Sequence, residues 1–284
     1  MHHITSYLSK TITYNAHAFV VWRMIFGLYF VFYALRMLPY IKEIYGSDGI
    51  VPVVTANWTY GIFPNILDIY SGYEAALVLH MILIVAGLAL AGGFLPRVAA
   101  LSIWYIQTAL YNRNVLTDDP SMAFVGLLLL MLALIPSQPK LSKRLEQIQI
   151  PYFVFYVPLF VFCLAFTVSG IDKLLSPSWF AGVAFGDMLT LAISRGGVLS
   201  AAILSHHFFI SFFTYTALSI QILSMCFFLF GMYRIALYSN LASFCLVFIL
   251  FDLNQVVIGM LFFFTFFGLR DIPYIHAFYK KLRA

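Results

Sequence analysis

Long runs of apolar residues, separated by short polar connections, dominate the pattern of this chain. A helix needs about 20 residues to cross the hydrocarbon core of a membrane. Runs that are apolar on every side predict helices surrounded by lipid or protein rather than helices with one wet face. We therefore predict an all-α fold, a polytopic transmembrane helical bundle in one domain over residues 1–284. The spans expected are about eight, at residues 17–38, 73–95, 97–113, 121–137, 151–173, 207–232, 234–251 and 253–269.

Residues 174–204 fit neither a span nor a free loop. The segment is too polar to cross a membrane and too apolar to be solvated throughout. Pro177 prevents the preceding helix from continuing easily, and Trp179 and Phe180 begin a series of large apolar side chains. This pattern predicts an amphipathic helix in the outer membrane interface, where it could cover a site near Lys173.

Composition supports a membrane protein and excludes several other classes. Of the 284 residues, 63% are hydrophobic and only 10% are charged, whereas soluble domains carry roughly 25% charged residues. The net charge of +5 is spread along the chain, which argues against a nucleic-acid partner. The three cysteines lie within apolar runs, so we interpret them as buried structural thiols. No paired metal-ligand motif is present, and we expect no metal.

Basic residues predict the orientation, because cytoplasmic connections carry an excess of Lys and Arg. With the N-terminus inside, the inner segments would carry twice as many of them as the outer ones. The inner set is Lys10, Arg97, Lys140, Lys143, Arg144, Arg234, Arg270, Lys280, Lys281 and Arg283, and the outer set is Arg36, Lys42, Arg113, Lys173 and Arg195. Both termini are therefore expected in the cytoplasm. Most acidic residues then lie outside, where we expect any chemistry.

Lys173 is the main candidate for chemistry. It ends the apolar run of the fifth predicted span, where an ionisable group is costly and is a functional candidate by default. On a helix it shares a face with Ser169 and Gly170, whose small side chains leave room for a ligand or a neighbouring helix. Asp172 points about 100° away and is not automatically its partner. The alternative is an interfacial anchor or a salt-bridge member.

Other polar residues are expected at the outer ends of the second, third and eighth spans, and we predict that they wall a pocket with Lys173. The candidates are His80, Asn112, Asn114, Asp252, Asn254 and Trp179. Two alternatives stay open at this point. His80 could be a satisfied core residue, and the polar residues after the third span could simply cap helices and solvate a loop.

Two separate stretches carry a more specific pattern. The first is the segment 19–28, in which Arg23 and Gly27 lie one turn apart, followed by the turn-forming pair Asp48 and Gly49. Arg23 could reach the inner headgroups along its aliphatic stem, or it could have a specific partner within the membrane.

The second stretch is Ser169–Leu174, a Gly-x-x-Lys-Leu sequence followed by Trp179 and Gly182. Together the two stretches resemble the HTTM domain, the membrane portion shared by vitamin K-dependent gamma-carboxylase and many bacterial proteins. The resemblance covers nearly the whole chain. It implies a bacterial inner (plasma) membrane location.

The resemblance also implies a role for Lys173, which matches the lysine that deprotonates vitamin K hydroquinone in the carboxylase. A lysine kept from water gives up its proton more readily and can then act as a base. Asn114 stands where the carboxylase has a histidine, and the carboxylase's large extramembrane domain has no counterpart in this chain. Other bacterial members resemble proteins that mature a secreted peptide toxin of the sporulation-delaying type with a partner protein.

The leading hypothesis is thus a membrane protein whose Lys173 acts as a base, in an outer-facing pocket, on a lipid-soluble quinol or on an exported peptide. A quinone or hydroquinone would be its cofactor, and the bilayer and a small partner protein its partners. The alternative is a non-catalytic accessory or immunity protein that binds a partner within the bilayer. A solute transporter is disfavoured because no inverted repeat or pair of broken helices is visible.

Overall fold

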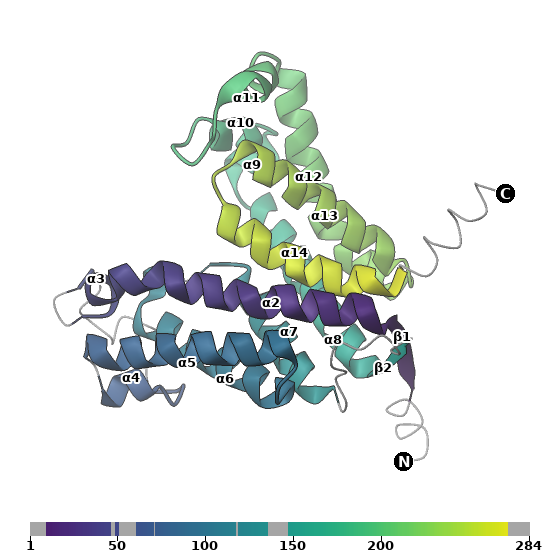
Figure 1. Ribbon diagram of the computed structural model, residues 1–284. Helices are drawn as coiled ribbons and strands as arrows, with labels where there is room; N and C mark the ends of the chain where they lie inside the picture. The colour runs from purple at the N-terminus through teal and green to yellow at the C-terminus, as the bar shows by residue number, and fades with distance from the viewer. Residues whose placement is uncertain are drawn as a thin grey trace. The chain divides into compact units, whose positions relative to one another are not determined.

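The computed structural model describes residues 10–46, 49–50, 61–70, 72–117, 119–135 and 147–271 (Figure 1). Helices make up most of this part of the chain, which confirms an all-α membrane bundle as the general architecture. By internal contacts the chain divides into two compact units, Met1–Phe155 with Thr265–Ala284, and Tyr156–Phe264. The single domain predicted over residues 1–284 stays a prediction.

The first unit is built around the long helices α2, α5 and α6, of which neighbouring pairs pack side by side (Figure 1). Its elements are β1 (Thr11–Asn15), α2 (Ala16–Met37), η1 (Leu38–Tyr40), α3 (Ile41–Tyr45), α4 (Ile66–Ile69), α5 (Tyr73–Gly92), α6 (Pro96–Arg113), η3 (Val115–Thr117), α7 (Met122–Leu134), β2 (Gln147–Pro151) and η4 (Leu269–Asp271).

The second unit is built around α12 and α13, which pack against each other. Its complete elements are α9 (Pro177–Phe180), α10 (Ala184–Leu189), α11 (Gly197–Leu204), α12 (His207–Leu229) and α13 (Tyr233–Leu250). Two further helices, α8 (Tyr152–Leu174) and α14 (Asn254–Gly268), have residues in both units.

Five helices in the described ranges are long and apolar enough to span a membrane, so the chain is a multi-pass membrane protein. They are Ala16–Tyr45, Tyr73–Gly92, Tyr152–Leu174, His207–Leu229 and Tyr233–Leu250. The predicted spans 121–137 and 253–269 correspond to the shorter apolar helices α7 and α14. The predicted span 97–113 forms α6, in which Arg97, Gln107 and Arg113 interrupt the apolar sequence.

Helices α2 and α5 approach so closely that only glycine fits at their crossing. A Cβ atom on Gly27 would lie 2.6 Å from both the carbonyl oxygen of Gly87 and the backbone nitrogen of Ala91. Near the end of the same helix pair, the guanidinium of Arg23 occupies the space where a Cβ of Gly93 would be. Arg23 is fully buried, so its guanidinium lies within the helix packing at the end of α5, and the choice between the two roles considered for it stays a prediction.

A two-stranded antiparallel sheet, which the all-α prediction did not include, joins β1 and β2. Both strands alternate exposed and buried positions, the period of two that a half-buried strand requires. Ile12 and Ile150 are paired on the buried face. On the exposed face the Thr11 hydroxyl donates to Gln149 Oε1 at 2.8 Å. Strands of five residues beside long apolar runs are easily missed.

The predicted interfacial helix over residues 174–204 is instead three short helices, α9, α10 and α11. Glycines in the left-handed region of φ interrupt the segment: Gly182 has a φ of 75°, and Gly196 and Gly197 have φ values of 65° and 90°. Such a backbone conformation ends a right-handed helix and strains residues that carry a Cβ atom. The segment is therefore divided between α9 and α10 and again before α11, instead of running as one helix.

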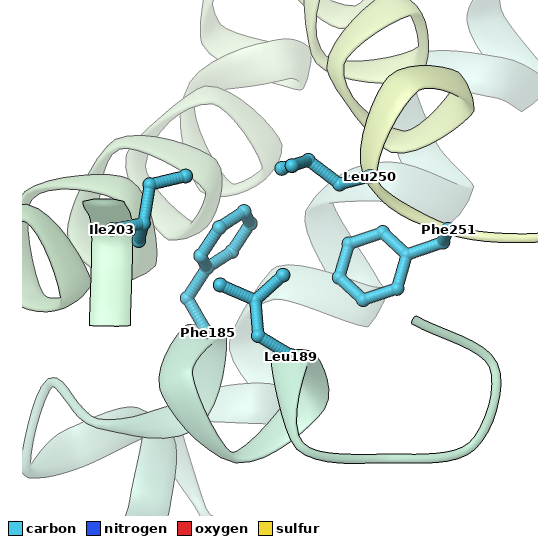
Figure 2. Packing of buried hydrophobic residues seen from close by; sticks show 5 residues of the cluster. All are labelled: Phe185, Leu189, Ile203, Leu250 and Phe251. Carbon is cyan, nitrogen blue, oxygen red and sulfur yellow. The ribbon is translucent and has the colours of Figure 1, made fainter. Parts of the chain in front are cut away.

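These short helices are anchored by a small hydrophobic core in the second unit (Figure 2). Phe185 and Leu189 of α10 pack with Ile203 of α11, and with Leu250 and Phe251 at the end of α13. All five side chains are buried. The core fixes residues 184–204 to the ends of α12 and α13, so this segment is an ordered part of the unit.

Candidate functional site

Lys173 lies in the last turn of α8 and its side chain is half-buried. Its amine donates hydrogen bonds to Ser169 Oγ at 2.7 Å and to Gln221 Oε1 of α12 at 2.9 Å. The amine also lies 5.5 Å from the centroid of the Trp179 ring, within the range of a cation–π interaction. The predicted contact with Ser169 one turn back is confirmed. Gln221 was not predicted, because it is 48 residues away in sequence.

The acceptors of this amine are neutral. Among the described residues, no carboxylate lies within ion-pair distance of Lys173. Asp172 adjoins Lys173 in sequence and acts on the amine through its charge, but it forms no ion pair with it. The amine is thus held by a hydroxyl and an amide and not by a carboxylate.

Gly170 allows α8 to approach α12 closely enough for the Lys173 contacts. A Cβ atom there would lie 2.9 Å from the backbone nitrogen of Ile222 and 3.0 Å from the Cβ of Gln221. Small residues at such a crossing let helix backbones approach each other in a membrane. Gly170, which sequence analysis assigned to a motif, therefore positions Gln221 beside the lysine.

Thr167 fixes the same crossing through its hydroxyl. The hydroxyl lies 3.2 Å from the Gln221 carbonyl and 3.1 Å from the Ile222 carbonyl, to which it can donate. It also accepts a hydrogen bond from the Met225 N–H at 3.0 Å. An uninterrupted helix would join the Met225 N–H directly to the Gln221 carbonyl. A side chain of α8 thus bonds the backbone of α12 at the residue that holds the amine.

The segment after α8, which carries Trp179 and Gly182, also contacts α12. A Cβ atom on Gly182 would lie 2.8 Å from the ring of Tyr215, and the Tyr215 hydroxyl donates to the Phe180 carbonyl at 3.0 Å. The backbone N–H of Phe185 donates to Thr214 Oγ1 at 3.1 Å. Glycine is needed at residue 182 both for its positive φ and for this close contact. The turn that carries Trp179 is thereby held against the helix that carries Gln221.

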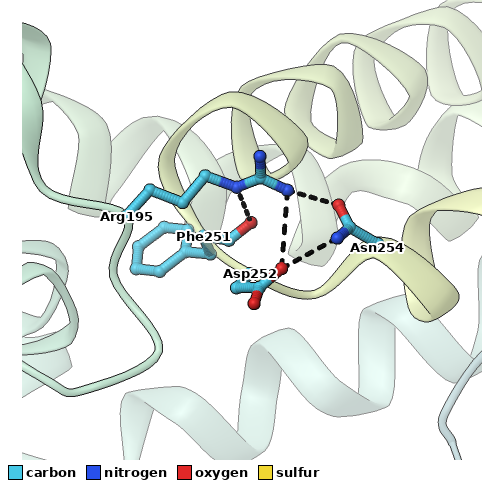
Figure 3. Close-up of polar contacts among 4 residues, drawn as sticks. All are labelled: Arg195, Phe251, Asp252 and Asn254. Atoms are coloured by element: carbon cyan, nitrogen blue, oxygen red, sulfur yellow. Dashed lines mark hydrogen bonds and ion pairs between the residues drawn. The ribbon is translucent and has the colours of Figure 1, made fainter.

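Asp252 and Asn254 belong to a separate polar group at the turn between α13 and α14 (Figure 3). Arg195 donates from Nε to the Phe251 carbonyl at 2.9 Å. Its Nη2 donates to Asn254 Oδ1 and lies 3.6 Å from Asp252 Oδ1. Asn254 in turn donates to Asp252 at 2.8 Å. These contacts tie Arg195 to the turn, and the role of Asp252 and Asn254 in a pocket stays a prediction.

Replacing Arg195 with Ala should lower the free energy of unfolding by about 1 kcal/mol, because the hydrogen bond to the Phe251 carbonyl, the exposed contact with Asn254 and one exposed ion pair are lost. Asp252→Ala should cost less than about 0.5 kcal/mol, since its carboxylate is largely exposed. Denaturant titration of the purified protein measures both values. Equal costs for the two variants would contradict the view that the carbonyl contact is the main one.

The remaining candidates lie in the first unit and make local contacts. His80 is fully buried, and its Nδ1 donates to the Ala76 carbonyl at 2.8 Å. Asn112 donates to Thr108 O at 2.8 Å, and Asn114 donates to the Ile44 carbonyl at 2.9 Å. These contacts agree with roles inside the helix packing and at the end of α6. A pocket shared by these residues and Lys173 stays a prediction.

Two further predictions concern the turn-forming pair Asp48 and Gly49 and the absence of a metal. The described residues cover each of them only in part. Asp48 lies outside the described residues, while the Gly49 N–H donates to the Gly46 carbonyl at 3.0 Å in a turn after α3. In the described ranges, no group of three or more His, Cys, Asp or Glu side chains is placed to hold a metal ion.

Comparison with known proteins leaves the family assignment as a prediction. No family model, curated protein or solved structure matches this chain. The proposal below therefore depends on the geometry around Lys173 together with the sequence motifs.

Proposed function

We propose that this chain is an HTTM-type membrane protein in which the Lys173 amine accepts a proton from a lipid-soluble quinol or from an exported peptide. The proposal includes eight spans, a bacterial inner (plasma) membrane, both termini in the cytoplasm and Lys173 at the outer face. The observation that carries it is the half-buried amine held only by neutral oxygens, those of Ser169 and Gln221.

The contacts of the amine suit a base. A charged lysine has three N–H donors, and Ser169 and Gln221 accept two of them. One position on the nitrogen remains for a substrate, on the side where Trp179 offers an aromatic surface for a flat ring. Gln221 keeps the amine oriented in either protonation state because its amide is never charged.

The proposed step with a quinol begins with proton transfer to Lys173. The neutral amine takes the proton of one quinol hydroxyl, which gives an ammonium group and a quinolate anion. Molecular oxygen, supplied from solution, then takes two electrons from the quinolate. It also takes the proton of the remaining quinol hydroxyl and the proton returned by the ammonium group, which yields quinone, hydrogen peroxide and the neutral amine. The protein contributes proton transfer and orientation only, and the oxidant is oxygen.

Oxygen uptake by the protein in lipid nanodiscs with a short-chain naphthohydroquinone tests this function. We expect uptake above that of protein-free nanodiscs, saturating as the quinol concentration rises. Uptake equal to that of protein-free nanodiscs would exclude the quinol as substrate.

A second function is favoured by one specific observation, that Lys173 joins α8 to α12. A non-catalytic accessory or immunity protein would use this link for assembly alone. Under this alternative, replacing Lys173 would reduce the amount of folded protein in the membrane, and the quinol would be oxidised at the protein-free rate throughout.

A further inference from the structure

Four tyrosines converge inside the first unit, to which Lys173 does not belong. We call Tyr29 and Tyr33 of α2, Tyr45 of α3 and Tyr111 of α6 the tyrosine cluster. Tyr29 and Tyr33 lie one turn apart with ring centroids separated by 6.5 Å. The Tyr111 hydroxyl interacts electrostatically with those of Tyr29, Tyr33 and Tyr45. The hydroxyl oxygens of Tyr29, Tyr45 and Tyr111 are buried, so these polar groups face the interior of the unit.

Two more buried polar side chains adjoin the cluster. The His80 ring lies 5.7 Å from the ring of Tyr45. Gln107 precedes Tyr111 by one turn of α6, so the two side chains share a face of that helix. Exposure is 0% for His80 and 5% for Gln107. The imidazole and the amide therefore belong to the same interior region as the tyrosines.

Three atoms of these two side chains make no hydrogen bond to any residue that the structure describes. They are Nε2 of His80 and both Oε1 and Nε2 of Gln107. His80 uses its other nitrogen as a donor to Ala76 O, so its Nε2 is an acceptor. A buried polar atom without a partner costs about 1–3 kcal/mol, and folded proteins satisfy nearly all such atoms with protein, water or ligand. Water or a polar ligand would satisfy these three atoms.

The surroundings define the chemistry of that occupant. The neighbouring charged groups are already engaged, since Asp119 accepts hydrogen bonds from the N–H and hydroxyl of Ser121 at 2.7 Å, and Arg113 donates to the Tyr45 carbonyl at 3.4 Å. The polar atoms without a partner in His80 and Gln107 are neutral. They are one donor, Gln107 Nε2, and two acceptors, His80 Nε2 and Gln107 Oε1. Their aromatic neighbours favour a flat apolar body, and small-molecule sites combine such walls with a few polar groups.

We propose that the tyrosine cluster, with His80 and Gln107, is a binding site for a small uncharged aromatic compound that carries a hydroxyl group. The hydroxyl donates to His80 Nε2 or Gln107 Oε1 and accepts from Gln107 Nε2. This site lies in the first unit, uses none of the Lys173 contacts and does not depend on the function proposed for that residue.

Binding of 4-fluorophenol, followed by fluorine NMR with the protein in nanodiscs, tests the site. We expect saturable binding that Gln107→Leu weakens at least tenfold. Tyr105→Phe is the matched control in the same helix, because the Tyr105 hydroxyl bonds the Pro64 carbonyl outside the cluster, and it should bind as the native protein does. Without ligand, Gln107→Leu should unfold at a higher denaturant concentration, since it removes two unsatisfied polar atoms.

Three results would overturn the proposal. One is binding no stronger than to protein-free nanodiscs, which would mean that water alone satisfies these atoms. The second is equal binding by the native protein and Gln107→Leu, and the third is a loss of binding in Tyr105→Phe as large as that in Gln107→Leu. If Gln107→Leu fails to accumulate, His80→Phe, which removes the Nε2 acceptor and keeps a flat ring, replaces it with the same expected loss.

Discussion

Lys173→Met should lower protein-dependent quinol oxidation by about a hundredfold to ten-thousandfold, the range that a positioned general base contributes. Methionine is also long and unbranched, so it keeps the apolar stem while removing the group that accepts the proton. The hydrogen bonds to Ser169 and Gln221 are lost as well. Some stability will be lost with them, so oxygen uptake must be expressed per folded protein, measured by size-exclusion chromatography of the solubilised sample.

The control for this variant is Lys42→Met. Lys42 is exposed in α3 and the same change of side chain there should leave the rate within about twofold of native, because surface substitutions away from a site have small effects. Gln221→Leu should lower the rate less than Lys173→Met does, because it removes orientation and not the base. A native rate per folded Lys173→Met protein would refute the catalytic role.

Gly27→Ala should destabilise the first unit by about 3 kcal/mol, the upper end of the cost of overpacking. The added methyl group would lie 2.6 Å from two backbone atoms of α5. Backbone atoms cannot rotate away, so α2 and α5 would have to separate and the packing around the buried Arg23 would loosen. The measurement is the denaturant midpoint of purified protein, with the yield in membranes as a second readout.

Gly92→Ala is the matched control, since it makes the same chemical change in the same unit. A Cβ atom on Gly92 meets no heavy atom within 4 Å, and alanine is favoured over glycine in a helix by roughly 0.5–1 kcal/mol. We therefore expect an unchanged or slightly raised midpoint. If both variants had the same midpoint, the close approach of α2 and α5 would not be a determinant of stability.

Apolar runs predicted the long helices well, because burial in lipid requires a continuous apolar sequence. The predicted span 73–95 became α5 at Tyr73–Gly92, and the predicted span 207–232 became α12 at His207–Leu229. Helix periodicity also predicted the contact between Lys173 and Ser169. Each of these inferences depends on residues that are near one another in the chain.

Contacts between distant segments were not predictable in the same way. Gln221 lies within an apolar run, and only the crossing of α8 and α12 at Gly170 brings it to Lys173. Likewise, Arg195 was assigned only to an outer segment, although it organises the turn at Asp252. Gln107 could have been noticed as a polar residue inside a predicted span. Tertiary packing decides which polar residues meet, and local sequence patterns carry no information about it.

Rescue of Lys173→Ala by added primary amines tests the central claim most directly. Truncation leaves space beside Ser169 and Gln221, and a small amine such as ethylamine can enter it from the half-exposed side. If Lys173 is the proton acceptor, the rate of quinol oxidation by Lys173→Ala will rise with amine concentration and with the basicity of the amine, while native protein will not respond. A rate that stays at the level of the variant with every amine would contradict the role of Lys173 as a base.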